Sequence, residues 1–263
     1  MSRLPILAPF LIALPLFAHA SPSCPQFGVQ GQLPALVHQQ FPGRTTPLCN
    51  GSYALLDADA TRAPLWSAEH LTRDEVKAAE RLKRHGQFHE DTRLPIEARS
   101  ELEDYRRSGF DRGHMTPSGD APTEALQAET FALSNVVPQT NALNSGPWSH
   151  IEQMVRNLAL RDGEVYVVTG PAYHSSVIAT IGPDHVKVPT STWKAVYDPK
   201  TGGAGVYVCR NEMRSPPCSQ VTVATLIRVT GVDPFPALSA DVKARPYRLP
   251  DGRHRQMNES AFP

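Results

Sequence analysis

The stretch SGFDRGHMTP at residues 108–117 places Arg112 and His114 on either side of a glycine, among turn-forming residues. Asn144 and Glu152 follow downstream, about two helical turns apart. This part of the chain therefore offers a base, a guanidinium, a neutral oxygen ligand and a carboxylate within a short span.

These residue types match what hydrolysis of a phosphodiester needs: a base for water, positive charge, and help for the departing oxygen. A neutral His114 can accept a proton near pH 7, because the usual pKa of histidine is about 6.5. Arg112 can hold a phosphate oxygen with its fork of donors. Asn144 offers a carbonyl oxygen to a hard ion such as Mg²⁺, and Glu152 can accept hydrogen bonds from the waters that this ion retains. The pattern predicts a phosphodiester-cleaving site with one metal ion.

Each of these residues also has an ordinary interpretation. A histidine after Arg-Gly is usually a turn or surface residue, and Asn135 and Asn144 could hydrogen-bond within their own loops. Glu152 could pair with Arg156 one helical turn later. Their occurrence together favours the site over the separate explanations.

The N-terminus has the features of a secretory signal. Residues 1–20 contain Arg3, an apolar run, and the small-x-small ending AHA at 18–20. An uncleaved anchor is the alternative, but prolines interrupt the run, which is shorter than the roughly 20 residues that span a bilayer. We therefore expect a periplasmic or secreted location, with no membrane contact after cleavage. Residues 21–50, rich in Pro and Gly, are predicted to form an N-terminal arm, and residues 51–263 one large domain.

The chain has four cysteines, an even count that suits disulfide bonds in an oxidising compartment. They are Cys24, Cys49, Cys209 and Cys218. Proximity along the chain favours the pairs Cys24 with Cys49 and Cys209 with Cys218. Four cysteines allow three pairings, so the sequence leaves the connectivity open.

Charge places limits on how nucleic acid could bind. The formal net charge is zero, so the whole molecule exerts no long-range attraction on a polyanion. Basic residues crowd the segment 81–112, but acidic residues of the same segment nearly cancel them. A mixed solvated surface is the plainer interpretation of this segment, and nucleic-acid binding would need a local patch.

Periodicity and capping signals predict three helices and several strands. The helices are expected at residues 67–84, with a capping box from Thr72 to Glu75, at 123–131 and at 148–160. The strands are expected at 53–57, 165–169, 186–188, 193–197, 205–209 and 221–225. This order predicts an α+β fold in which helices flank a central, largely antiparallel sheet.

Several short motifs carry a family resemblance. They are DRGH at 111–114, MTP at 115–117 with Asp120, ETF at 129–131, LSN at 133–135, PQ at 138–139, Asn144, Trp148, Glu152, VR at 155–156 and YVVTGP at 166–171. Together they resemble the DNA/RNA non-specific endonuclease family, the ββα-metal or His-Me finger group. The resemblance extends from about Phe88 to Leu238.

The resemblance implies a ββα-metal finger active site and an Mg²⁺-dependent endonuclease, with Mn²⁺ as a substitute ion. It implies cleavage of DNA and RNA with little sequence specificity, leaving 5′-phosphate ends. By resemblance, His114 is the general base, Asn144 the direct Mg²⁺ ligand, and Glu152 a carboxylate that holds water of the ion. Arg112 then contacts the phosphate and the transition state.

Two further residues receive roles from the same resemblance. Asn135 corresponds to a residue that orients the site, and Arg99 occupies the spacing of the family's other basic site residue. Members of the family often form homodimers, and the sequence identifies neither a dimer face nor an inhibitor protein.

Two other function classes remain open at this point. One is a catalytically inactive nucleic-acid-binding protein of the same fold. The other is a structural or adhesive protein held together by disulfides, which would leave the spacing of the histidine and asparagine unexplained.

Overall fold

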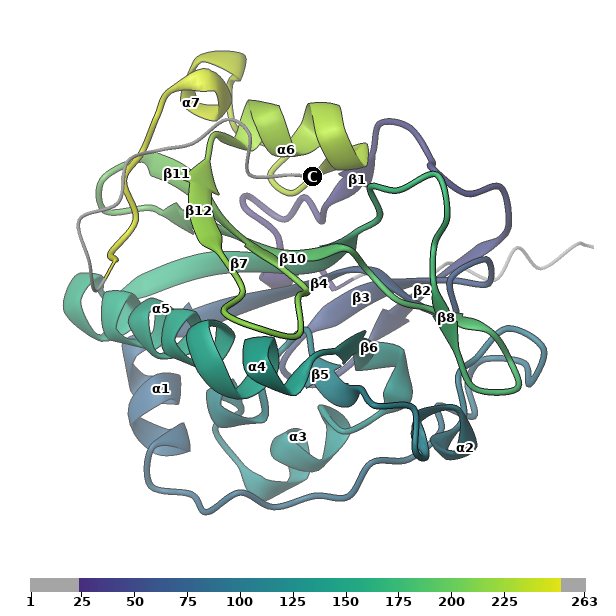
Figure 1. The fold of residues 1–263 in the computed structure, drawn as a ribbon. Helices are drawn as coiled ribbons and strands as arrows, with labels where there is room; N and C mark the ends of the chain where they lie inside the picture. The colour runs from purple at the N-terminus through teal and green to yellow at the C-terminus, as the bar shows by residue number, and fades with distance from the viewer. Residues whose placement is uncertain (1–23, 252–263) are drawn as a thin grey trace, which may run out of the picture.

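A computed structural model of the chain describes residues 24–251 (Figure 1). The predicted signal segment, residues 1–20, lies outside the described residues. Over the described part, the largest sheet has seven strands in the order β12-β11-β10-β7-β4-β3-β2, and all neighbours are antiparallel. The strands are β2 (Thr45–Cys49), β3 (Ala54–Ala58), β4 (Ala63–Thr72), β7 (Glu164–Ala172), β10 (Ser191–Asp198), β11 (Gly203–Arg210) and β12 (Cys218–Val221). This architecture confirms the predicted α+β class.

Helices cover both faces of this sheet (Figure 1). On one face, α5 (Ser149–Asp162) packs Ile151, Val155 and Leu158 against the strands, beside α1 (Arg73–Ala79). On the other face, α6 (Val223–Thr230) and α7 (Ala240–Ala244) cover a core that includes Trp193 and Leu226. Two hydrophobic cores on opposite faces of one sheet make a layered α/β/α arrangement.

Shorter elements complete the fold and carry most of the motif residues. They are η1 (Pro25–Phe27), β1 (Ala35–Leu36), α2 (Leu102–Tyr105), β5 (Asp111–His114), η2 (Ser118–Asp120), α3 (Glu124–Glu129), η3 (Leu133–Asn135), β6 (Val136–Gln139), α4 (Asn141–Leu143), η4 (Asn144–Trp148), β8 (Thr180–Ile181), β9 (Val186–Lys187) and β13 (Val232–Asp233). Strands β5 and β6 form a separate two-stranded ribbon below the large sheet, on the side of α5 (Figure 1).

The helix predicted over residues 67–84 is wrong at both ends. Helix α1 extends only from Arg73 to Ala79, and residues 67–72 continue strand β4. Pairing with β3 on one side and β7 on the other satisfies the backbone of this segment, so tertiary pairing overrides its local preference. The predicted capping box is confirmed: the Thr72 side chain accepts from the amide of Glu75, and the Glu75 carboxylate accepts from the amide of Thr72.

The strand predicted at 221–225 is also wrong beyond its first residue. Strand β12 ends at Val221, and α6 begins at Val223. The Thr222 hydroxyl accepts a hydrogen bond from the amide of Thr225 at 3.1 Å, which caps the new helix. Burial of Val223 and Leu226 against the sheet then outweighs the strand preference of a β-branched run. The other predicted helices and strands are found, with boundaries shifted by a few residues.

Both disulfides join the cysteines that are near in sequence. Cys24 is bonded to Cys49, which ties the start of the described chain to the end of β2. Cys209 is bonded to Cys218, and the two residues face each other in the register of β11 and β12. Of the helices between residues 24 and 251, none is long and apolar enough to cross a membrane.

Candidate active site

The β5–β6 ribbon positions the histidine. His114 ends β5 and lies opposite Val136 of β6. Between it and Arg112, a Cβ on Gly113 would overlap the side chain of Gln139 on the facing strand. A larger residue at this position would therefore displace the buried Gln139 side chain.

Asn135 holds the loop that follows the histidine. Its side chain accepts from the amide of Thr116 at 3.0 Å and donates to the carbonyls of Thr116 and Thr130, both at 2.9 Å. Its own carbonyl accepts from the amide of Met115 at 2.9 Å. Because Asn135 is fully buried and these bonds occupy its side-chain amide, it acts on the site by bracing the His114 loop.

His114 lies in an aromatic enclosure. Its ring centroid is 5.1 Å from that of Phe88 and 4.9 Å from that of Phe131, which meets it edge-on at 90°. Burial, together with the nearby charge of Arg84, lowers the pKa of His114 to about 3. Its Nε2 atom has no hydrogen-bond partner within the described part of the chain. At neutral pH the site therefore holds an uncharged imidazole with a buried ring nitrogen that no described residue occupies.

Two arginines share these aromatic walls. The guanidinium carbon of Arg112 lies 5.3 Å from the centre of the Phe88 ring and 5.6 Å from that of Tyr105. The guanidinium carbon of Arg84 lies 5.0 Å from the centre of the Phe131 ring. The buried Nε of Arg112 has no partner among residues 24–251. Both cations thus contact the rings that enclose His114, which gives the site the local positive charge that the neutral whole molecule lacks.

Arg84 was missed by the sequence reasoning. It appeared only as one of many basic residues before the DRGH motif, and no spacing signal distinguished it from its neighbours. Arg99, which was predicted, pairs with Glu101 at 2.9 Å and donates to the carbonyl of Leu94 at 3.4 Å. The recorded contacts of Arg99 in the described chain include none with His114 or Arg112.

Asn144 is held next to the ribbon by Asp111. The Asn144 amide nitrogen donates to the Asp111 carboxylate at 3.0 Å, and Asn141 donates to the same oxygen at 2.9 Å. This bond orients the amide, so the carbonyl oxygen of Asn144 is the atom left to bind an ion. Asn144 opens η4, in which Gly146 departs from helical geometry with φ −107° and ψ −118°. The helix therefore does not run unbroken from Asn144 to Glu152.

Glu152 lies in a layer of charged side chains between α5 and the sheet. Burial is the main cause that raises its pKa to about 7; Asp120 adds to this, whereas Lys194 and Arg156 oppose it. Arg156 does not pair with Glu152 as one interpretation suggested, because it forms an ion pair with Asp120 at 2.7 Å. The pKa of the Glu152 carboxyl therefore lies near neutral pH.

The sheet contributes two further members to this charged layer. Opposed residues of antiparallel strands share a face, so Ser67, Thr169 and Lys194 line up beneath α5. The buried Lys194 ammonium donates to the Thr169 hydroxyl at 2.6 Å and lies 5.6 Å from the ring centre of Trp148. Glu69 shares this face, and burial, more than the Asp120 charge, raises its pKa well above the usual range. Glu69 was not singled out by the sequence, and Lys194 received no site role within the predicted strand 193–197, since a single polar residue in a strand resembles an exposed position.

The donor set fits a hard, hydrated cation. Asn144 and Glu152 offer oxygen atoms, and the described cysteines are all bonded in disulfides. Buried polar atoms of His114, Gln139 and Trp148 have no hydrogen-bond partner within residues 24–251. A site with few protein ligands and several waters is what Mg²⁺ prefers.

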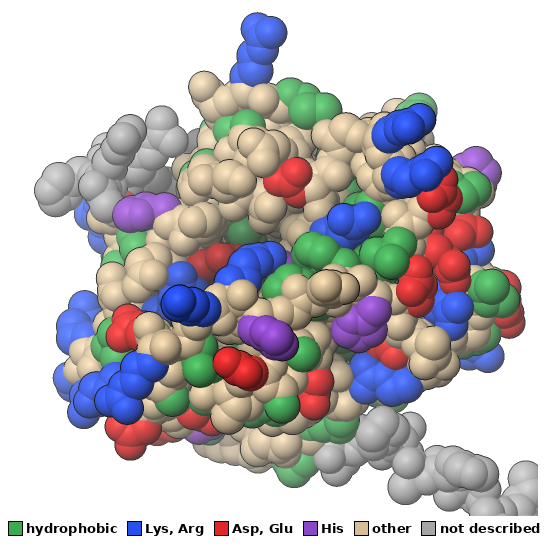
Figure 2. Space-filling view, turned by 90° about the horizontal axis from the view of Figure 1, so that it is seen from below, with side chains coloured by type: hydrophobic (Ala, Val, Ile, Leu, Met, Phe, Trp, Pro, Cys, Tyr) green, Lys and Arg blue, Asp and Glu red, His purple; other side chains and the backbone are tan. Residues whose placement is uncertain are grey.

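The surface seen from the side of α1 and α3 is electrostatically mixed (Figure 2). Blue basic and red acidic side chains are interspersed over this face, with histidines among them. This agrees with the cancelling charges of the segment 81–112 and leaves the positive charge of the site to individual arginines.

A sequence model described as DNA/RNA non-specific endonuclease matches residues 34–241. The chain belongs to this family. Nuclease C1 of Cunninghamella echinulata var. echinulata is 37% identical over 160 residues, which are 57% of this chain and 64% of that protein. Mitochondrial endonuclease G of Bos taurus is 33% identical over 213 residues, covering 77% of this chain and 69% of the relative. Membership confirms the family predicted from the motifs and places the chain among nucleases.

A solved structure supports the same relationship. The crystal structure of the EndoG/EndoGI complex, which concerns EndoG inhibition, matches with a TM-score of 0.65 and 30% sequence identity. The match covers 74% of this chain and 89% of that one. The layered fold is therefore shared with an EndoG protein. The chain spans only 59% of the length of another relative, mitochondrial EXOG of Danio rerio, which is 35% identical over 204 residues.

The comparisons contradict the predicted periplasmic or secreted location. The relatives EXOG and endonuclease G are named as mitochondrial nucleases, as are those of Saccharomyces cerevisiae and Schizosaccharomyces pombe. An apolar N-terminal run after a basic residue was therefore too weak a signal to decide the compartment.

Proposed function

We propose that this protein is an Mg²⁺-dependent endonuclease that hydrolyses phosphodiester bonds of DNA and RNA with little sequence specificity. The products would carry 5′-phosphate and 3′-hydroxyl ends. One observation carries the proposal: a neutral, buried histidine with an unpartnered Nε2 lies among aromatic rings that two arginines also contact. Family membership supports the reaction class.

In this proposal His114 is the general base. With its pKa lowered by burial and by Arg84, it is uncharged at neutral pH and can take a proton from water at Nε2. Asn135 keeps the loop after His114 in place through its bonds to Thr116.

Arg112 and Arg84 would bind the substrate phosphate. Their guanidinium groups carry fixed positive charge at neutral pH and offer several donors to phosphate oxygens. Charge beside the phosphorus stabilises the transition state more than the ground state, because negative charge grows on the equatorial oxygens. Arg99 keeps its predicted role only as a secondary candidate, since Glu101 already occupies its guanidinium.

Asn144, through its carbonyl oxygen, would hold Mg²⁺, and Glu152 would accept hydrogen bonds from the ion's waters. Mn²⁺, with similar oxygen preference, is the substitute ion. When bound, the ion supplies positive charge to the phosphate and to the departing 3′ oxygen. Asp111 orients Asn144 for this role through the 3.0 Å hydrogen bond.

The test is cleavage of supercoiled plasmid and of a structured RNA by the purified protein, with Mg²⁺ and with EDTA, beside His114→Ala. We expect metal-dependent loss of both substrates by the wild type and none by the variant. No cleavage by folded wild type would instead favour an inactive nucleic-acid-binding protein of the same fold. Equal cleavage by His114→Ala would overturn the role of the histidine.

The division of the chain and its assembly are part of the same proposal. Residues 51–263 would form the nuclease domain behind an arm of residues 21–50, of which β2 already pairs into the large sheet. A homodimer is proposed from the family resemblance, and light scattering of the purified protein checks it. The EndoG neighbour was solved with an inhibitor, so inhibition by a protein partner is proposed by analogy.

A further inference from the structure

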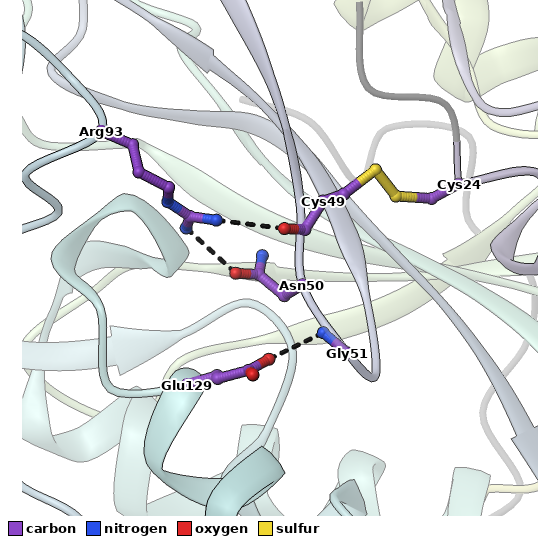
Figure 3. Close-up of a disulfide and its surroundings, with 6 residues drawn as sticks. All are labelled: Cys24, Cys49, Asn50, Gly51, Arg93 and Glu129. Carbon is purple, nitrogen blue, oxygen red and sulfur yellow. Dashed lines mark hydrogen bonds between the residues drawn. A yellow bond between two sulfur atoms is a disulfide. The ribbon is translucent and has the colours of Figure 1, made fainter.

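A chain of contacts links the Cys24–Cys49 disulfide to the segment that surrounds the histidine. Figure 3 shows its first part: the Arg93 side chain reaches the turn after Cys49. One terminal nitrogen of Arg93 donates to the Cys49 carbonyl and the other to the Asn50 side chain, both at 3.0 Å. The turn between β2 and β3 is thus held by an arginine from a distant part of the sequence.

Asp91 forms the next link. Its carboxylate accepts from Arg93 Nε at 2.8 Å and from Arg93 Nη2 at 2.6 Å, a two-pronged ion pair. The same carboxylate accepts from the Ser134 hydroxyl at 2.6 Å. Asp91 is 5% exposed and Ser134 is 4% exposed, so water competes little for the bond between them, whereas the Arg93 side chain is 42% exposed. Asp91 therefore joins Arg93 to the residue directly before Asn135.

Ser134 belongs to a segment that lies alongside the chain leading to Asp91. The His89 amide donates to the Phe131 carbonyl at 3.2 Å, and the Leu133 amide donates to the His89 carbonyl at 2.9 Å. These bonds set two short segments side by side, and each carries one of the rings that contact His114, Phe88 and Phe131. A shift between the segments would move both rings relative to the imidazole.

We propose that Asp91 and Arg93 are positioning residues for the reaction. They fix the two segments that enclose His114 and tie them to the disulfide-bonded turn at Cys49. This role rests on the proposed function, in which His114 is the general base. Neither residue contacts His114 in the described contacts, so both act through Ser134 and the neighbouring backbone. Misplacement of a catalytic group by about 1 Å can cost about a hundredfold in rate, so a small shift is enough to be measured.

The first experiment compares Arg93→Lys with Arg44→Lys. Lysine keeps the charge but cannot form the two-pronged pair with Asp91 while also reaching Cys49 and Asn50. Arg44 pairs with Asp59 at 3.2 Å and is mostly exposed, which makes it a matched control. We expect Arg93→Lys to lower kcat by about tenfold to a hundredfold, with KM changed less than about twofold. Arg44→Lys should match the wild type.

A second readout does not depend on activity. The ring-proton resonance of His114, assigned by its absence in His114→Gln, reports the neighbouring Phe88 and Phe131 rings. We expect this resonance to shift in Arg93→Lys and to stay in place in Arg44→Lys. Should the wild type show no cleavage, the proposed function fails, whereas the resonance still tests the positioning.

The positioning role would be overturned by a kcat of Arg93→Lys within about twofold of wild type together with an unmoved His114 resonance. A lower free energy of unfolding beside these two results would make the pair merely structural. If Arg93→Lys does not fold, the same criteria apply to Ser134→Ala, which removes only the last hydroxyl of the chain of contacts.

Discussion

The histidine loop and the α5 layer bury ionisable groups among different neighbours. His114 lies between the rings of Phe88 and Phe131, and its pKa falls to about 3. Glu152 lies among charged side chains, and its pKa rises to about 7. Burial is the largest cause of both shifts, since removal from water favours the neutral form of an acid and of a base alike.

The difference between these two regions lies in what happens at neutral pH. Neutral pH lies far above the pKa of His114, so small changes of pH leave its imidazole uncharged. Neutral pH lies close to the pKa of Glu152, so the charge of this carboxyl depends on the nearby cations Lys194 and Arg156. An aromatic enclosure therefore makes one group insensitive to pH, whereas a charged layer leaves the other adjustable. The predictions below test this contrast.

The largest effect is expected on the histidine side. His114→Ala should lower kcat by about a thousandfold, since general bases contribute about a hundred- to ten-thousandfold. Plasmid cleavage under saturating Mg²⁺ measures it, with circular dichroism as the control for folding. Activity within tenfold of wild type would mean that another group is the base.

Substitution of Glu152 should lower activity less than substitution of His114. Glu152→Gln is expected to lower activity by about tenfold to a hundredfold, the usual range for groups that act on a metal through its water. The Mg²⁺ concentration for half-maximal cleavage should rise, as titration of cleavage against Mg²⁺ would show. Exposed Gln153 on the same helix is the matched control: Gln153→Ala should titrate as wild type does.

The ion pairs of the charged layer should also contribute to the free energy of unfolding. Arg156 and Asp120 are 14% and 3% exposed, and Arg156→Met leaves the carboxylate of Asp120 buried without its partner. We expect a loss of about 3 kcal/mol in the free energy of unfolding, as is typical when one member of a buried pair is removed. Urea denaturation measures the loss. Arg44→Met, which breaks the exposed pair with Asp59, should cost about 1 kcal/mol or less.

The pH dependence of stability, smaller per pH unit than the loss expected for Arg156→Met, should have opposite signs in the two regions. The folded pKa of His114 lies below its unfolded value, so its stabilising contribution is complete above about pH 6.5 and is lost as pH falls toward 3. The folded pKa of Glu152 lies above its unfolded value, so its contribution is lost as pH rises from about 4.5 to 7.

Urea denaturation in EDTA between pH 4.5 and 6.5 separates these contributions. The free energy of unfolding of the wild type minus that of His114→Gln should rise with pH. The same difference between the wild type and Glu152→Gln should fall with pH. Each slope is at most about 1.4 kcal/mol per pH unit. Slopes of the same sign would contradict the contrast between the two regions.

The sequence predicted much of the fold and part of the site. Helix α5 was predicted because its apolar residues repeat at helical spacing, and the capping box at Thr72 was read from two residues three apart. Residues 67–72 and 223–225 were assigned to the wrong secondary structure, because helix or strand there depends on the neighbouring strands and helices that they contact. Local preference is too weak to decide such segments against tertiary burial.

In the candidate site, too, some residues were visible in the sequence and others were found only in the structure. His114 and Arg112 are adjacent in one motif, and the spacing of Asn144 and Glu152 was visible in the chain. Arg84 belongs to the site because its guanidinium lies over the Phe131 ring. No local sequence pattern predicts this contact. The Asp91–Arg93 pair was equally hidden, since its partners Cys49 and Ser134 come from opposite sides of the sequence.

By itself, then, the sequence determined the family, the disulfide candidates and the candidate site residues, because these depend on residue type and near spacing. The tertiary structure alone decided that His114 is neutral, that Glu152 titrates near neutral pH, and that Arg99 is committed to Glu101. Such properties depend on burial and on charges brought together from distant segments. A linear pattern contains neither the desolvation of a side chain nor the distance between two charges.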